Sequence, residues 1–226
     1  MTAEEIIAQL KTYESAKNRE GMARFGISGK NVLGGPNLPT LRKMAKEIGK
    51  DHELAQELWA SGIHEARMLA AFIDEPDKVS EKQFDSWAAD FDSWDICDTV
   101  CGGLLDKTPF AYQKAFEFVR KEAEFERRVG FVVMAWLAVH DKKMTDDKFI
   151  KFFPSLKKYA DDERNYVKKA INWALRQIGK RNSYLNKEAI KLAEEIAKID
   201  SKSARWIAAD AIRELKSKNI VLRIKN

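Results

Sequence analysis

The residue types best suited to chemistry lie together in one short segment, FDSWDICDTVCGGLL (91–105). If this segment is helical, Trp94 and Asp98 lie one turn apart on the same face, and Asp95 points roughly 100° away. A carboxylate held beside an indole ring can stabilise a developing positive charge, and an indole can stack on a sugar or a base. The alternative is that Trp94 packs in the core and Asp98 is an ordinary surface charge.

A pair of arginines opens a second segment of interest, ERRVGFVVM (126–134). Arg127 and Arg128 precede a long apolar stretch, and two adjacent guanidinium groups at the start of a helix suit a phosphate group. The alternative is a surface ion pair with Glu124 or Glu126, which would contribute little stability.

A third segment, NYVKKAINWALRQ (165–177), combines an indole with several cations. Helical spacing places Trp173 one turn from Lys169 and one turn from Arg176 or Gln177. This pattern is typical of a surface that binds nucleic acid. A core Trp in an amphipathic helix explains the same pattern equally well.

Other kinds of site lack their usual spacing. Cys97 and Cys101 lie one helical turn apart without a second pair to complete a zinc site, so we expect buried, reduced thiols. The glycine-rich stretch 26–39 contains no GxxxxGK[ST] motif, and the chain has no GxSxG motif. An HExxH motif is also missing from the surroundings of the three histidines, His52, His64 and His140.

The composition indicates a folded protein with an uneven charge. The chain has 226 residues, of which 45% are hydrophobic and 33% charged, which is too apolar for a disordered protein. Its net charge is +5, yet residues 1–110 hold 13 basic and 19 acidic residues, whereas residues 111–226 hold 27 and 16. A basic half is typical of a polyanion binder, although Lys-rich helices are often only solvated surfaces.

The sequence also suggests where the protein resides. Two cysteines cannot form a disulfide framework, which favours a cytoplasmic protein. The longest stretch without a charged residue is Val129–His140, with 12 residues. A membrane span needs about 20 residues, so we expect no association with a membrane.

Nearly all segments indicate α-helices, and 26–39 is expected to be a loop. Capping boxes are predicted at Thr2–Glu5 and Ser80–Gln83, N-caps at Thr40 and Ser93, and Pro109 in the first turn of a helix. The expected helices cover the N-terminal segment after Thr2, 41–48, 54–60, 65–73, 81–90, 94–105, 110–121, 125–140, 145–153, 163–180, 186–199 and 203–217.

Weak internal repeats connect these helices. Segments that begin near residues 126, 165 and 203 recur at intervals of about 40 residues, close to the length of a HEAT repeat. We therefore predict an all-α solenoid of HEAT-like repeats, one domain over 1–226, in preference to an irregular bundle. Stacked repeats would align their first basic residues into a stripe on a curved, partly basic surface: Arg67, Arg128, Lys168 and Arg205.

Taken together, the motifs SWDICD (93–98), RR (127–128) and KKAINWALRQ (168–177) resemble the AlkD-like family of DNA alkylation repair enzymes, over about residues 20–215. These are alkylpurine DNA glycosylases built from HEAT-like repeats. The resemblance implies that Asp98 is the catalytic acid, that Trp94 and Trp173 flank the lesion, and that Arg128 or Arg127 contacts DNA. It gives no match for the loop 26–39.

The resemblance implies a reaction as well as a site. Asp98 and the indoles would stabilise an oxocarbenium-like sugar as an alkylated purine leaves duplex DNA, without a metal or a cofactor. We expect a monomer that binds DNA through basic residues of the second half: Arg127, Arg128, Lys168, Lys169, Arg176 and Arg205. The alternatives are a non-catalytic protein that binds damaged or branched DNA and a protein–protein scaffold.

Overall fold

The structure is a computed structural model that describes residues 1–29 and 31–225. These residues form helices, turns and loops, and none of them lies in a strand. The chain divides into two compact units, Met1–Pro109 and Phe110–Asn226. This division lies one residue from the boundary between the acidic and the basic half of the sequence.

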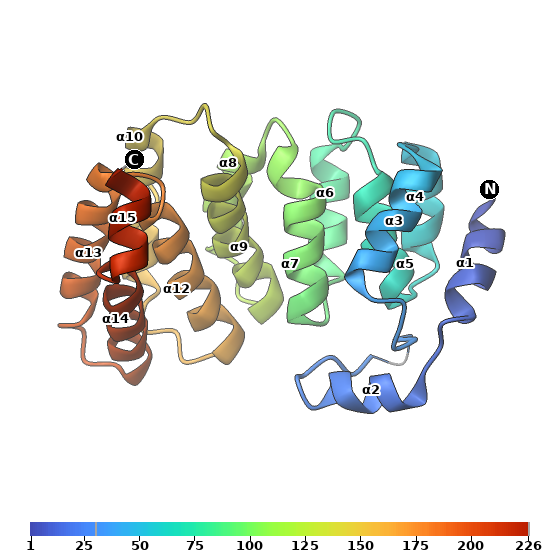
Figure 1. Cartoon of the computed structure of the whole chain (residues 1–226), viewed down its shortest axis with the longest axis horizontal. Helices are drawn as coiled ribbons and strands as arrows, with labels where there is room; N and C mark the ends of the chain where they lie inside the picture. The colour runs from blue at the N-terminus through green and yellow to red at the C-terminus, as the bar shows by residue number, and fades with distance from the viewer. Residues whose placement is uncertain (30, 226) are drawn as a thin grey trace. The chain divides into compact units, whose positions relative to one another are not determined.

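In the first unit, α5 packs against α3, α4 and α7 (Figure 1). Its buried core includes two tryptophans, Trp59 and Trp87, whose rings stack with centroids 3.9 Å apart. The elements of this unit are α1 (Ala3–Lys11), α2 (Ala16–Ala23), α3 (Leu38–Ile48), α4 (His52–Ala60), α5 (His64–Ile73), α6 (Glu81–Ala89), α7 (Trp94–Gly103) and the 3₁₀ turn η1 (Leu105–Lys107).

In the second unit, α9 packs against α8 and α12, and α12 also packs against α13 and α14 (Figure 1). Residues 128–135 of α9 are buried all around the helix. Gly130 allows a close approach, because a Cβ atom there would lie 2.6 Å from the backbone nitrogen of Val119. The elements are α8 (Ala111–Phe118), α9 (Glu124–His140), α10 (Asp146–Ile150), α11 (Phe153–Lys158), α12 (Asn165–Gly179), α13 (Ser183–Ile196), α14 (Lys202–Leu215) and α15 (Lys218–Lys225).

The start of α3 differs from the sequence prediction. Its N-cap is Asn37, whose side chain accepts a hydrogen bond from the backbone N–H of Thr40. Thr40 was therefore wrongly predicted as the cap. The reason is that Pro39 fits the first turn of a helix, where no N–H is needed. Pro109, in contrast, was predicted inside the first turn of a helix but precedes the N-cap of α8.

The capping box predicted for α6 is only half formed. Ser80 accepts a hydrogen bond from the backbone N–H of Gln83, as expected. The side chain of Gln83 does not return to Ser80. It donates instead to the fully buried carboxylate of Asp74, at 2.6 Å. The buried carboxylate of Asp74 needs a hydrogen-bond donor, so the side chain of Gln83 turns toward it and not toward the backbone of Ser80.

Three helices were missed in the sequence: α2, α11 and α15. α2 has no buried residue, so it lacks the apolar spacing that indicates a helix. The helix expected over 145–153 is two helices, α10 and α11, and the second begins at Phe153 with Pro154 in its first turn. The helix expected over 186–199 starts earlier, at Ser183, because Asn182 is its N-cap.

The predicted all-α class is confirmed for the described residues. That residues 1–226 form a single domain remains a prediction.

Candidate functional site

Trp94 and Asp98 lie on the same side of α7, as the sequence predicted. The opposite side of this helix is buried in the first unit through Ile96, Cys97, Val100 and Cys101. Both Trp94 and Asp98 are partly exposed, so neither belongs to the core. The indole N–H of Trp94 donates to the backbone oxygen of Phe25 at 2.9 Å, which fixes the plane of the ring.

The end of the glycine-rich loop 26–39 is anchored by a buried carboxylate. Glu65, at the start of α5, is only 2% exposed and accepts hydrogen bonds from three successive backbone N–H groups at 2.9–3.3 Å: those of Leu33, Gly34 and Gly35. Buried carboxylates require such partners. Gly34 has a φ of +80°, and a Cβ there would lie 2.5 Å from the oxygen of Ser15. The glycine-rich loop therefore supports α7.

A histidine–carboxylate pair, which the sequence analysis missed, lies next to Trp94. The imidazole Nε2 of His64 is 2.9 Å from the carboxylate of Asp95. Burial lowers the pKa of His64, but the hydrogen bond to Asp95 and the charges of nearby carboxylates outweigh burial and raise it. The pair joins the first turns of α5 and α7. No local motif could have revealed it, because the two residues are 31 positions apart.

The two cysteines of α7 are buried free thiols, as predicted. Burial raises the pKa of Cys101 well above its usual value, and the neighbouring Cys97 and the charges of Asp98 and Asp106 raise it further. Cys101 is therefore a neutral thiol at neutral pH and a poor nucleophile. The two acidic side chains of α7 are Asp95 and Asp98.

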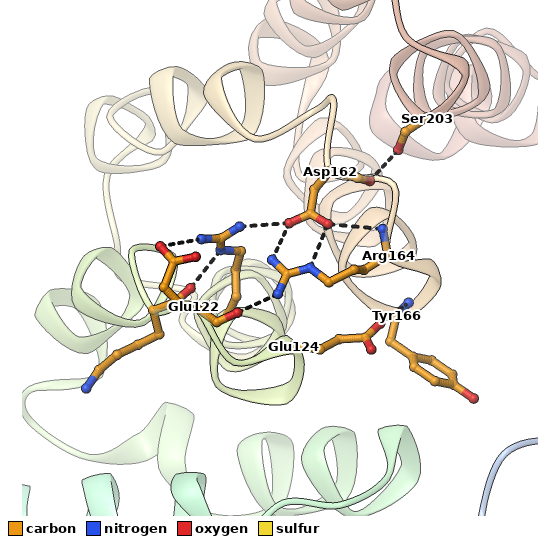
Figure 2. Close-up of polar contacts among 8 residues, drawn as sticks. Glu122, Glu124, Asp162, Arg164, Tyr166 and Ser203 are labelled. Carbon is orange, nitrogen blue, oxygen red and sulfur yellow. Dashed lines mark hydrogen bonds and ion pairs between the residues drawn. The ribbon is translucent and has the colours of Figure 1, made fainter.

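The arginine pair of the second unit is largely occupied by structural contacts. Arg127 binds the Oδ2 atom of Asp162 at 2.9 Å. Arg164 binds both oxygens of the same carboxylate (Figure 2). Burial would raise the pKa of Asp162, but the hydrogen bonds from Arg164 and Arg127 lower it to about 2. The main-chain oxygen of Asp162 also accepts a hydrogen bond from Ser203 of α14.

Arg128 is buried as well, at 4% exposure, and donates to the main-chain oxygen of Tyr166 in α12. The ring of Tyr166 points away from the ion-pair cluster (Figure 2) and stacks on Phe125 of α9. The surface ion pair considered for the arginines is thus a set of partly buried links between helices. Whether Arg127 or Arg128 contacts DNA remains a prediction.

The residues of the predicted basic stripe have different surroundings, and one of them is buried. Arg128 does not belong to it, because its guanidinium group is buried. Arg67 in the first unit lies over the Trp59 ring, 5.1 Å from its centroid, and pairs with Asp90. Arg205 is exposed and pairs with Asp200.

The side chains predicted along α12 have different surroundings. Trp173 is partly exposed and meets Trp136 of α9 edge to face, with centroids 5.3 Å apart. Lys169 is exposed, without a carboxylate within ion-pair distance among the described residues. Arg176, in contrast, is bound to Glu214 and Asp210 of α14.

One tryptophan was assigned to the wrong environment. In the sequence, Trp59, Trp87, Trp136 and Trp206 have apolar neighbours, which predicts a position in or near the core for each of them. Trp59 and Trp87 are buried and Trp136 partly so, but Trp206 is 41% exposed. The Nζ atom of Lys168 lies 5.9 Å from the centroid of its ring. Trp206 is therefore a surface residue with a cation beside it.

Within 1–29 and 31–225, no helix is both long and apolar enough to cross a membrane. The same residues contain no group of three or more His, Cys, Asp or Glu side chains arranged to hold a metal ion.

The helices and their packing define a HEAT-like repeat protein. The sequence profile of the DNA alkylation repair enzymes matches residues 6–215, so the chain belongs to the family of DNA alkylation repair enzymes. It is 20% identical to the uncharacterized protein Lin0241 of Listeria innocua, over 88% of each chain.

A solved structure has the same fold, with a TM-score of 0.79, 21% identity and 95% of each chain covered. It represents a family of proteins related to the HEAT-like repeat DNA glycosylases, with affinity for branched DNA structures.

Proposed function

We propose that this protein is a DNA glycosylase that hydrolyses the N-glycosidic bond of alkylated purines in duplex DNA. The observation that carries the proposal is the arrangement of α7: an indole fixed by a hydrogen bond to Phe25, one turn from the partly exposed carboxylate of Asp98. Membership of the DNA alkylation repair family supports the same conclusion.

The chemistry requires little more than charge stabilisation. An N3- or N7-alkylated purine carries a positive charge, so the C1′–N bond breaks with its electron pair moving to the base. The sugar that remains is an oxocarbenium-like cation. The carboxylate of Asp98 stabilises this cation and orients a water molecule, which adds to C1′ and loses a proton to leave an abasic site.

An indole can act on this cation as well. The face of an indole attracts positive charge, by about 0.5–2 kcal/mol for each ring. Trp94 is held in one orientation by its N–H, so its face is available without reorganisation. Trp173 is the residue that the family resemblance assigns to the second ring. Its edge-to-face contact with Trp136 supports it within the second unit.

Duplex affinity is assigned to cations of the second unit. Lys168, Lys169 and Arg205 are the predicted DNA-binding residues whose charged groups are least engaged in buried ion pairs. Contacts with phosphate release counterions, so binding should weaken steeply as the salt concentration rises.

A second candidate function is binding to branched DNA without base release. Two observations favour it. Arg127 and Arg128, the arginines expected to contact DNA, are held in contacts within the second unit. A protein of the same fold belongs to a family with affinity for branched DNA. This candidate predicts DNA binding that survives Asp98→Asn, with no abasic sites formed.

The test is release of 7-methylguanine and 3-methyladenine from methylated duplex DNA. The wild type is compared with Asp98→Asn and with a matched control, Asp92→Asn, which neutralises an exposed carboxylate just before α7. We expect release by the wild type and the control and a loss of at least about 100-fold in Asp98→Asn. Absence of release by the wild type, at excess protein and with binding intact, would favour the second candidate.

A further inference from the structure

Trp206 is the one tryptophan that the described structure leaves largely exposed, at 41%. It lies in the second turn of α14, and the ammonium group of Lys168, from the neighbouring helix α12, stands over its ring at 5.9 Å. Tryptophan is enriched at binding interfaces, because its ring offers a large apolar face together with an N–H donor. The proposed glycosylase chemistry does not use this residue.

The two helices that carry this pair are strongly basic. α12 and α14 together contain six basic residues and two acidic ones. Both carboxylates are already bound: Asp210 by Arg176 and Arg213, and Glu214 by Arg176 and Lys180. Within these two helices, basic side chains are therefore in excess of carboxylates.

Three of these cations have no carboxylate within ion-pair distance among the described residues: Lys168, Lys169 and Lys202. Arg205 pairs only with the exposed Asp200. An exposed indole with the Lys168 ammonium group over its ring, on helices with an excess of basic residues, matches the chemistry of a nucleotide, which offers a base to stack and a phosphate to neutralise.

The base that stacks on Trp206 must be unpaired. Inside a duplex both faces of each base are covered by its neighbours, so a surface indole cannot reach them. We infer that Trp206 and Lys168 form a stacking platform for an unpaired nucleotide next to duplex DNA, such as a single-stranded overhang or the arm of a branch. The inference rests on the DNA binding proposed above and adds a site to it.

Fluorescence anisotropy tests the platform with two labelled DNAs: a blunt duplex and the same duplex with a single-stranded overhang. The wild type should bind the second more tightly, by about tenfold. Trp206→Ala should lose this preference and keep the affinity for the blunt duplex. Trp206→Phe should retain most of it, because a phenyl ring also stacks.

Two controls separate stacking from other effects. Tyr184→Ala removes an aromatic side chain that is 50% exposed on α13 and should leave both affinities unchanged. An overhang made of abasic nucleotides offers phosphate without bases. The wild type and Trp206→Ala should bind it equally well. Thermal unfolding of each variant shows whether the fold is kept.

The outcomes distinguish the two proposals. If the wild type binds no DNA at low salt, the proposed function fails. If it binds the blunt duplex but shows no preference for the overhang, or if Trp206→Ala keeps the preference, the platform is wrong and the proposed function stands. If Trp206→Ala lowers the affinity for the blunt duplex, the overhang DNA and the abasic-overhang DNA by the same factor, the platform is also wrong. Trp206 would then contact the backbone of the duplex.

Discussion

The helices α7 and α12 both carry residues that the sequence marked for function, but they hold them differently. On α7, Trp94 and Asp98 remain partly exposed, and the indole N–H of Trp94 donates a hydrogen bond to the main-chain oxygen of Phe25. Around the start of α12, polar groups form contacts with α9 and α14. Asp162 binds Arg127 of α9 and Ser203 of α14, and the backbone N–H of Tyr166 donates to Glu124 of α9. The two helices show that residues marked in a sequence can either remain partly exposed or be used in contacts between helices, and a count of basic residues does not separate these two cases.

Glu65 should have the largest effect on stability, because it supports the loop beside α7. Glu65→Ala would leave three buried N–H groups without an acceptor and should lower the free energy of unfolding by about 3 kcal/mol. Urea unfolding measures the loss, and limited proteolysis should show cleavage within 25–36. Glu57→Ala, at an exposed position on α4, is the control. Equal stability of the two variants would contradict the anchoring role.

Asp162 tests the second unit, where a charged side chain holds helices together. Asp162→Asn should cost about 2 kcal/mol at pH 7, because Arg127 and Arg164 lose a shared partner that is only partly screened by solvent. Asp161→Asn, one residue earlier and exposed, should have little effect.

The stabilisation from Asp162 has a defined pH range. Its pKa in the folded protein is about 2, below the usual value of 3.8, so its contribution is complete above pH 4 and is lost as the pH falls toward 2. The difference in melting temperature between the wild type and Asp162→Asn should shrink over this range. A difference that stays constant down to pH 2 would show that the carboxylate is not paired in solution.

Trp94→Phe should have a smaller effect on stability. The change removes the N–H that donates to the oxygen of Phe25 and should cost about 1 kcal/mol, measured by urea unfolding. Base release should fall more than stability does, because the ring then loses its fixed orientation. If release is unchanged while stability drops, the indole is a structural support only.

The pair of His64 and Asp95 should have the smallest effect on stability among these predictions. The pKa of His64 is raised, so its protonation stabilises the fold fully below pH 6.5, and this contribution is lost as the pH rises through the raised value. In Asp95→Asn, burial should dominate and lower the pKa below 6.5. An NMR titration of the imidazole measures both values, and a pKa that does not change in the variant would contradict the pair.

Local patterns were sufficient to predict most of the fold. Helices such as α9 and α12 were found because apolar residues recur at helical spacing, and the face shared by Trp94 and Asp98 follows from a four-residue interval. The burial of Arg128 could not be predicted, because it depends on a main-chain oxygen 38 residues away, that of Tyr166. The contact between His64 and Asp95 is equally remote in sequence.

The misplacement of Trp206 was avoidable. The buried residues of α14 recur at three- or four-residue intervals: Ser203, Ala204, Ile207, Ala208, Ala211 and Leu215. This spacing leaves position 206 on the outer face of the helix. Its apolar neighbours suggested a core residue, although a shift of one residue turns a side chain by about 100°.

The most direct test compares Asp98→Asn on α7 with Lys169→Ala on α12 in single-turnover base release from a methylated duplex, with Kd measured on the same DNA. A division of labour between the two helices predicts that Asp98→Asn lowers the rate of release at saturating protein and leaves Kd unchanged. Lys169→Ala should raise Kd and leave the saturated rate unchanged. If both variants change the same quantity, or if Asp98→Asn releases bases as fast as the wild type, the assignment of the reaction to α7 is wrong.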